Sequence, residues 1–500
     1  MPYEAEWQLN AMPSGELGPL RRHIKKFVLG GALIVLFSAV AVASALLIEV
    51  TDDVRIVQKA STPIPRVEEV LADVEVGAPQ TIMLLGSDKR FADTADMPPR
   101  SDTIILAHLD PDSGATAIMS LPRDLQVDIP GHGTRKINEA FELGGAALSV
   151  ETVTLLLGLP INHVVNINFG GFRRAVDRLG CVYADVDRRY FNDNSGGENY
   201  ATIDLEPGYQ KLCGSDALDF VRFRHEDSDF VRAARQQEFL RQAKEQIGIG
   251  KLFGDRGELL KIFGRYTQTD ISADNDAAIL RLLKLAYESS KTPLREIPFP
   301  AEDTPGGYVE IGPKKLAKTR EAFIEVRGRE PEASSRKKEP KRIKATKGLA
   351  PGLMLAEREG EDHVLSMDLR LGKRGLPVYF PAARLARGGY VKTTSPRSYE
   401  IYDRNKNRYR AYRIVLSHDE NGQYYGVQGM TWKAPPILDN PTDEVRMRKR
   451  TYKRYFDGRK IRLIAWETPK AVYWVSNTLS QKLTNKQMMG IARSLQRVGE

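Results

Sequence analysis

Residues 81–121 read TIMLLGSDKRFADTADMPPRSDTIILAHLDPDSGATAIMSL. This stretch contains three apolar runs, each about as long as a β-strand. Between the second run, 102–109, and the third, 115–121, stands Asp-Pro-Asp-Ser-Gly, a set of residues typical of turns. The pattern therefore predicts three strands, with a turn between the last two.

Helices and further strands are expected beyond this stretch. Apolar residues have helical spacing at 138–157 and 172–179, and short apolar runs typical of strands occur at 163–169 and 182–186. Such alternation predicts an α/β or α+β domain, in which helices flank a central β-sheet. We expect this domain to occupy 78–300. Further helices are expected at 229–247, 258–266 and 274–289.

A segment without charged residues spans 27–48. It is long enough to cross a bilayer, which takes about 20 apolar residues. Basic residues in 21–26 precede it, so the positive-inside rule places 1–26 in the cytoplasm and the rest of the chain outside. A cleaved signal peptide is the alternative, because 39–45 is rich in alanine, but the apolar run exceeds the usual 7–15 residues or so. We expect a single-pass, type II membrane protein, with a stalk at 49–77.

Two cysteines, Cys181 and Cys213, lie on the expected outer side. An even pair in an oxidising compartment favours a disulfide over a metal site, which would need further ligands at matching spacing. The net charge of +9 suits an anionic partner. Outside a membrane this indicates phospholipid or a polyanionic wall polymer, and no DNA- or RNA-binding motif supports a nucleic acid as partner.

The last part of the chain has a different composition. Residues 301–348 are expected to form a charged linker, because 326–348 contains a basic run at 336–344 and almost no apolar side chains. From 349 to 500, alternating Tyr, Val, Ile and Trp predict a mainly β domain of unknown role, and Thr484 can cap a final helix. The clearest strands are expected at 399–417, 423–432 and 460–466.

Residues 221–237 read VRFRHEDSDFVRAARQQ. The run places Arg222, Arg224, Arg232 and Arg235 within about two helical turns of Asp229 and Gln236. Guanidinium groups match phosphate oxygens bidentately, so the run is a candidate wall of a polyphosphate site. Taken alone, it is explained better by a solvated basic helix.

Polar residues at the ends of the three strands of 81–121 favour the interpretation of 221–237 as part of a polyphosphate site. Asp88 ends the first strand, Arg100 and Asp102 open the second, and Arg123 follows the third. Neighbouring strands would bring these ends together. Two carboxylates beside several arginines suit Mg²⁺ held against a pyrophosphate, because Mg²⁺ prefers oxygen ligands and often shares them with phosphates. Each Asp alone is better explained as a turn residue or ion-pair partner.

In their order along the chain, these segments resemble the motifs of the LytR-CpsA-Psr family of cell-wall glycopolymer ligases. The matching pieces are LLGSD ending at Asp88, RSDT from Arg100, LPRD around Arg123, KINEA from Lys136, VRFRH from 221 and DFVRAARQQ from Asp229. The preceding membrane segment also agrees. The resemblance covers roughly residues 78–250.

The resemblance implies a phosphotransferase that moves a glycopolymer from a polyprenyl-pyrophosphate carrier to peptidoglycan, at the outer face of a bacterial cell membrane. It implies that Asp88 and Asp102 hold Mg²⁺, with Mn²⁺ as the alternative ion. The catalytic residues that bind the pyrophosphate would be Arg100, Arg123, Arg222, Arg224 and Arg232, with Asp229 fixing an arginine. The substrate-binding residues would be Lys136, Asn138, Arg235 and Gln236, of which the last two would complete or order the site.

Two other functions are compatible with the same residues. A receptor that binds a prenyl phosphate without catalysis would need the arginines but not the pair Asp88 and Asp102. A pyrophosphate hydrolase would use water in place of the acceptor. The sequence does not determine which glycopolymer is transferred.

Overall fold

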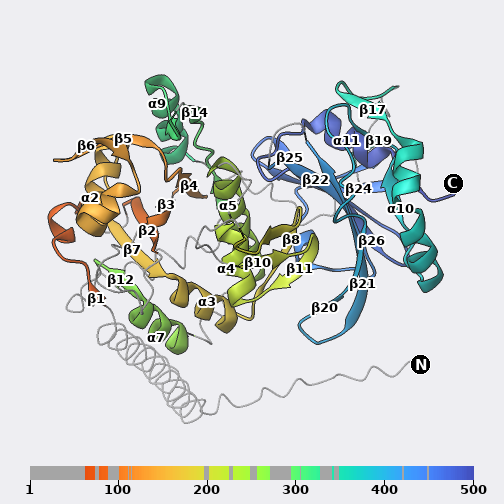
Figure 1. The fold of residues 1–500 in the computed structure, drawn as a ribbon, viewed down its shortest axis with the longest axis horizontal. Coiled ribbons are helices and arrows are strands. Elements are labelled where there is room, and N and C mark those ends of the chain that lie inside the picture. The colour runs from red at the N-terminus through yellow and green to blue at the C-terminus, as the bar shows by residue number, and fades with distance from the viewer. Residues whose placement is uncertain are drawn as a thin grey trace, which may run out of the picture. The chain divides into compact units, whose positions relative to one another are not determined.

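The computed structural model describes residues 62–73, 78–87, 101–110, 112–113, 115–195, 202–223, 229–247, 256–270, 294–304, 306–326, 341–342, 348–418, 422–447 and 450–499. The chain divides into two compact units, Met1–Arg55 and Ile56–Glu500, and all described residues belong to the second. The expected membrane segment 27–48 and helix 274–289 lie outside the described residues. The described unit contains two large sheets, one in its first part and one in its C-terminal part (Figure 1).

A seven-stranded sheet of order β1-β12-β7-β2-β3-β4-β13 forms the first part. β2, β3 and β4 are an antiparallel meander, which confirms the three strands expected in 81–121. β7 pairs parallel with β2 on the other side. The strands are β1 (Thr62–Pro63), β2 (Gln80–Ser87), β3 (Ser101–Leu109), β4 (Thr116–Leu121), β7 (His163–Asn168), β12 (Thr267–Thr269) and β13 (Leu294–Glu296).

Helices cover this sheet, which confirms the expected class of central sheet and flanking helices. α2 (Glu139–Leu157) buries Val150 and Val153 in the same core as Met83 and Leu106 of the sheet. Among the described helices, α2 has the length and hydropathy that a membrane span requires, and its packing in this core accounts for its apolar composition. The other helices are α3 (Phe169–Arg178), α4 (Gly214–Arg222), α5 (Asp229–Gln246), α7 (Arg256–Tyr266) and α9 (Pro313–Ile324).

The start of the expected linker 301–348 is instead ordered structure of the first part. Its first residues form a hairpin and α9, and Phe323 of α9 is fully buried in the core that α2 joins. The apolar side chains of α9 are few, which is why composition alone hid this helix. Two-stranded antiparallel sheets complete the part: β5 (Gln126–Ile129) with β6 (Gly133–Lys136), β8 (Val182–Val186) with β11 (Gly208–Leu212), β9 (Tyr190–Asn192) with β10 (Ile203–Leu205), and β14 (Glu302–Thr304) with β15 (Tyr308–Glu310).

The C-terminal part is built on an eight-stranded sheet of order β16-β23-β24-β25-β26-β22-β21-β20, which confirms the expected strand-rich domain. Thr484 caps its last helix through a capping box with Gln487, and Met488 and Ile491 of that helix are buried. The sheet consists of β16 (Lys341–Arg342), β20 (Arg397–Tyr402), β21 (Arg408–Ser417), β22 (Tyr424–Met430), β23 (Asp443–Met447), β24 (Arg450–Asp457), β25 (Lys460–Glu467) and β26 (Val472–Ser476). Around it lie α10 (Glu357–Leu371), α11 (Asn485–Arg493), β17 (Leu353–Leu355), β18 (Tyr379–Pro381), β19 (Ala383–Leu385) and β27 (Leu495–Arg497).

The two faces of this second sheet have different partners. Side chains alternate between faces along a strand, so Tyr412 and Ile414 of β21 join the core shared with α10 and α11, while Arg413 points the other way. Arg413 is fully buried and pairs with Asp185 of β8 at 3.1 Å. The C-terminal sheet is therefore packed against the first part through buried charged and aromatic side chains.

Candidate functional site

The ends of three strands of the first sheet meet at one edge. Ser87, the last residue of β2, faces Ser101 of β3 and also Asn168 of β7. The register shifts by a bulge between Gly86 and Ser87, a feature that often lies next to active sites. The backbone of Asp102 lies at the start of β3, at this edge.

Several expected residues of this edge lie outside the described residues: Asp88, Arg100 and Arg224, and the side chains of Asp102 and Asp229. Their roles stay predictions. The described residues still define the walls around the edge, from β4, from α4 and from α5.

The first wall follows β4, whose last residue Leu121 pairs with Ile104 of β3. Arg123 lies two residues further, with its Nε 3.5 Å from Oδ2 of Asp124. Oδ1 of Asp124 pairs with the ammonium group of Lys136 at 3.0 Å. The backbone N–H of Asn138 donates to the carbonyl of Arg123 at 3.2 Å. The structure thus brings Arg123, Lys136 and Asn138 together, through an aspartate that the sequence interpretation had not singled out.

The side chains of this wall suit an anionic ligand. Those of Arg123 and Asp124 are 14% exposed and that of Lys136 is 29% exposed, so the two cations are shielded but reachable. Asn138 is 7% exposed, and its Oδ1 has no hydrogen-bond partner within the described part of the chain. A buried acceptor whose hydrogen bond is not made costs about 1–3 kcal/mol. Such an acceptor therefore indicates a partner such as a ligand or a bound water.

The second wall is the end of α4, where Arg222 is the last helical residue. Its guanidinium carbon lies 4.5 Å from the ring centroid of Phe169, a cation–π contact. Phe169 directly follows β7, whose last residue pairs with Ser87. The contact therefore holds Arg222 beside the edge where β2 ends, as the expected site requires.

A carboxyl next to Arg222 has an unusual pKa. Burial raises the pKa of Asp219 to about 6, while the nearby Arg222 opposes that rise. The raised pKa means that contacts with neighbouring groups do not fully offset the cost of removing the charged Asp219 carboxylate from water at neutral pH. Sequence reasoning missed Asp219 because its neighbours in space, not in the chain, remove it from water.

The third wall is α5, which connects the strands with α4. The Gln236 side chain donates to Oγ1 of Thr103 at 3.1 Å and to the carbonyl of Val221 at 3.2 Å. Gln237 donates to Oγ of Ser120 at 3.3 Å. Arg232, one turn before Gln236, is 6% exposed. These bonds fix α5 across the beginning of β3 and the end of β4.

Arg235 is placed to order the site, one of its two expected roles, and not to bind substrate. It is fully buried, and its Nη1 donates to the carbonyls of Phe220 and Phe223 at 3.1 and 2.8 Å. Its guanidinium also lies 4.4 Å from the ring centroid of Tyr190. Arg235 therefore stabilises the end of α4, where it can order Arg222 but cannot reach a ligand from its buried position. The Gln236 amide connects α5 to Thr103 and Val221, and its role as a substrate-binding residue stays a prediction.

The structure contains a disulfide between Cys181 and Cys213. Cys213 is the N-cap residue of α4, and the next backbone N–H, of Gly214, donates to Oδ1 of Asp177 at 2.7 Å. Among the described residues, these two cysteines and Asp177 form a group of potential metal ligands whose ligand atoms lie within 4.8 Å of one another. Because the disulfide leaves no thiolate, the group holds the start of α4 rather than a metal.

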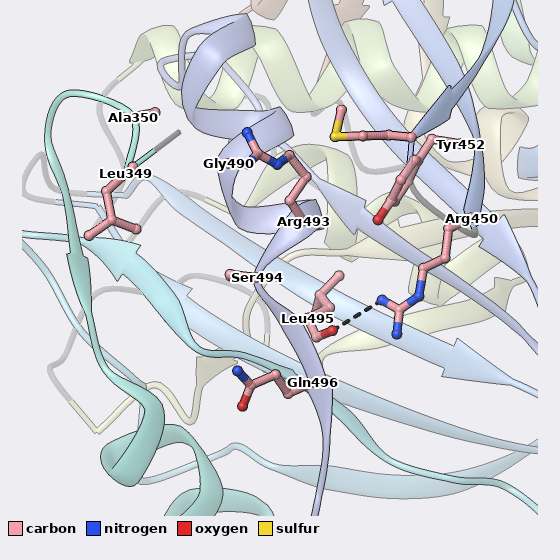
Figure 2. Close-up of a pocket in the computed structure, with 11 residues that line it drawn as sticks. Leu349, Ala350, Arg450, Tyr452, Gly490, Arg493, Ser494, Leu495 and Gln496 are labelled. Atoms are coloured by element: carbon pink, nitrogen blue, oxygen red, sulfur yellow. Dashed lines mark hydrogen bonds between the residues drawn. The ribbon is translucent and has the colours of Figure 1, made fainter. Parts of the chain in front are cut away.

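A separate cavity of 490 Å³ lies in the C-terminal part (Figure 2). Met447, Arg450 and Tyr452 line it from the sheet and Arg493 from α11, and none of the expected site residues contributes to it. Arg450 donates to the carbonyl of Leu495 at 3.1 Å, as the dashed line in Figure 2 shows. The guanidinium of Arg450 thus has a structural partner within the domain.

A model of the LytR_cpsA_psr family matches residues 49–319, more than half of the chain. The chain belongs to the LytR_cpsA_psr family. The match includes the meander, all three walls of the candidate site and most of α9.

Two curated relatives are named polyisoprenyl-teichoic acid–peptidoglycan teichoic acid transferase TagU. The one from Oceanobacillus iheyensis is 34% identical over 207 residues, which are 40% of this chain and 61% of the relative. The one from Enterococcus faecalis is 29% identical over 266 residues, 53% of this chain and 83% of the relative. The chain thus spans less than two thirds of the first relative's length. Among solved structures, "TagT bound to LI-WTA" is 25% identical, with a TM-score of 0.40, over 52% of this chain and 97% of that one.

Proposed function

We propose that this protein transfers a glycopolymer from a polyprenyl-pyrophosphate carrier to peptidoglycan. Family membership and the transferase name of the relatives support the reaction class. The observation that carries the proposal is that Arg123 and Lys136 follow the end of β4, and Arg222 contacts Phe169 after β7, at the same edge of the sheet where β2 ends. Cations gathered at a sheet edge can bind a pyrophosphate and stabilise the phosphate that leaves.

The reaction is a displacement at phosphorus. A hydroxyl oxygen of peptidoglycan attacks the phosphorus that carries the glycopolymer, and a new P–O bond forms. The bond from that phosphorus to the bridging oxygen breaks, polyprenyl phosphate leaves, and the hydroxyl proton passes to solvent. The product is a phosphodiester. Arg123 and Arg222 would neutralise charge on the leaving phosphate, as would Arg100, Arg224 and Arg232 of the same motifs.

Mg²⁺ is the cation we propose for Asp88 and Asp102, with Mn²⁺ as the alternative. The donor set favours a hard cation, because in the sequence Asp88 and Asp102 directly follow Ser87 and Ser101, which pair with each other. Mg²⁺ would supply charge neutralisation at the phosphates. The arginines and Lys136 of this chain would orient the pyrophosphate independently of the ion.

We propose that the protein is anchored in the membrane by 27–48, as a single-pass type II protein. Its lipid-linked substrate would then be reached at the outer face of the same membrane. The length of the uncharged segment and its basic flank support the topology. Resistance of the intact protein to alkaline carbonate extraction tests the anchor.

The test of function uses the full chain in detergent with a synthetic lipid-pyrophosphate saccharide, peptidoglycan fragments and Mg²⁺. We expect a joined product by mass spectrometry, released together with lipid phosphate. Lipid phosphate that forms at the same rate without peptidoglycan would indicate the hydrolase instead. Binding of the donor without any turnover would indicate the receptor.

A further inference from the structure

A cavity of 740 Å³ lies where the first part of the unit meets the C-terminal domain. The wall formed by the first part contains Ser120 and Pro122 at the end of β4, and Phe299 in the segment after β13. One face of α5 adds Phe230 and Gln237. This volume is within the roughly 300–1,000 Å³ of small-molecule sites, so a segment of a polymer the size of a disaccharide can enter.

The second side of the cavity belongs entirely to the C-terminal domain. Gln423 lines it before β22, and the turn between β24 and β25 contributes Asp457 and Lys460. The segment after β26 contributes Ser480 and Lys482. The C-terminal domain thus supplies one complete wall of a site whose other wall is part of the family domain.

The cavity is next to the candidate active site but is distinct from it. Residues advance about 100° each around a helix, so Phe230 and Gln237 lie on one face of α5 while Arg232 lies on the opposite face. At the end of β4 the two sites adjoin, because Pro122 lines the cavity and Arg123 is the next residue. A molecule in the cavity can therefore present a group towards Arg123 without occupying the place of the pyrophosphate.

The lining indicates a hydrated, hydroxyl-rich ligand. Ten of its 20 residues carry polar or charged side chains, a mixed lining that fits both the hydroxyl groups and the apolar ring faces of a saccharide. Gln423 is 3% exposed, its Nε2 donates to Ser480 at 3.1 Å, and its Oε1 has no hydrogen-bond partner among the described residues. A hydroxyl or amide N–H of a saccharide would satisfy such an acceptor. Phe230 and Phe299 offer apolar surface for the faces of sugar rings.

On the C-terminal wall, the exposed charges favour a ligand that also carries carboxylates. Of the three carboxylates in the lining, Glu296 and Asp457 pair with Arg241, and Asp303 belongs to the wall of the first part. Lys460 and Lys482 are exposed, and the ammonium group of Lys460 lies 2.8 Å from the carbonyl of Gln481. Two exposed ammonium groups at one wall attract an anion.

We propose that this cavity binds the acceptor, a peptidoglycan glycan strand with its carboxylate-bearing stem peptides, and that the C-terminal domain is an acceptor-recognition domain. This inference rests on the proposed function, since it names the place of the second substrate. The acceptor hydroxyl would arrive from the side of Pro122, and the donor pyrophosphate from the edge of β2.

The test compares two charge-reversed variants of the full chain in detergent. Lys460→Glu/Lys482→Glu alters the cavity, and Lys470→Glu/Lys486→Glu makes the same change of net charge at exposed residues that do not line it. We expect the first variant to raise the KM for soluble peptidoglycan fragments about tenfold or more, as charge reversal at a contact site does. The KM for the lipid-linked donor should stay within about twofold, and the control should match wild type.

Direct binding separates this inference from the proposed function. Calorimetry with the same peptidoglycan fragments should show binding to wild type and to the control, and loss of binding in Lys460→Glu/Lys482→Glu, even if no transfer is detected. An unchanged acceptor KM together with unchanged binding would overturn the inference while leaving the transferase intact. A change confined to the donor KM would also overturn it, and would assign the cavity to the lipid-linked substrate.

Discussion

Replacing Arg235 by alanine tests whether this residue orders the site or binds substrate. The side chain is fully buried and donates to two carbonyls at the end of α4, those of Phe220 and Phe223. Hydrogen bonds from charged groups contribute about 1.5–3 kcal/mol each, so losing both costs roughly 3–6 kcal/mol. Arg235→Lys keeps the charge but can serve fewer acceptors, and it should cost about half as much.

Thermal unfolding and amide hydrogen exchange of the full chain in detergent would measure this effect. We expect a lower unfolding temperature and faster exchange in Gly214–Arg222, together with a loss of transfer activity through displaced Arg222. Arg265→Ala, at an exposed residue of α7, is the matched control and should change neither. If Arg235→Ala abolished transfer with unchanged stability and exchange, Arg235 would contact substrate and our interpretation would be wrong.

Three further outcomes follow from the structure. Arg222→Ala should reduce transfer by about 10²–10³-fold with little change in unfolding temperature, because it removes charge stabilisation at the leaving phosphate. Its control is Arg174→Ala, at an exposed residue of α3, and an equal loss of transfer in both variants would contradict the role of Arg222. Burial raises the pKa of Asp219 from 3.8 to about 6. The folded state thus binds this proton more tightly, and the stabilisation present below about pH 4 is lost as pH rises through about 6. The gain in unfolding temperature from Asp219→Asn should therefore be larger at about pH 7.5 than at about pH 4.5, and a gain independent of pH would refute the assignment. Cys181→Ser/Cys213→Ser opens a loop with a sequence separation of 32 and should cost about 3–4 kcal/mol of stability, seen as a lower urea midpoint; an unchanged midpoint would show that the fold does not depend on the disulfide.

Local patterns in the sequence predicted most elements of the fold. The meander in 81–121, α2, β8 and the capped helix α11 all lie where apolar spacing and turn or cap residues indicated. These features depend on neighbours within a few residues, which is why the sequence reveals them. The short helix α9 was missed, because its place in the core depends on contacts with α2 and the sheet rather than on its own composition.

The candidate site was predicted in part. Arg123, Lys136 and Asn138 converge as expected, and Arg222 lies beside the end of β2. The roles of individual residues in the run 221–237 could not be separated, because each arginine in a helix has the same chemistry until packing decides which is exposed.

The sequence by itself determined the main strands and helices and the motifs that mark the family, and it predicts the membrane segment 27–48. Only the tertiary structure decided that Arg235 supports α4 from a buried position, and that Asp124 joins Arg123 to Lys136. It also decided that the C-terminal domain forms a wall of a cavity at the end of β4. Periodicity and charge are properties of neighbouring residues along a chain. Burial and pairing arise between residues that are distant in the sequence, and folding alone brings those together.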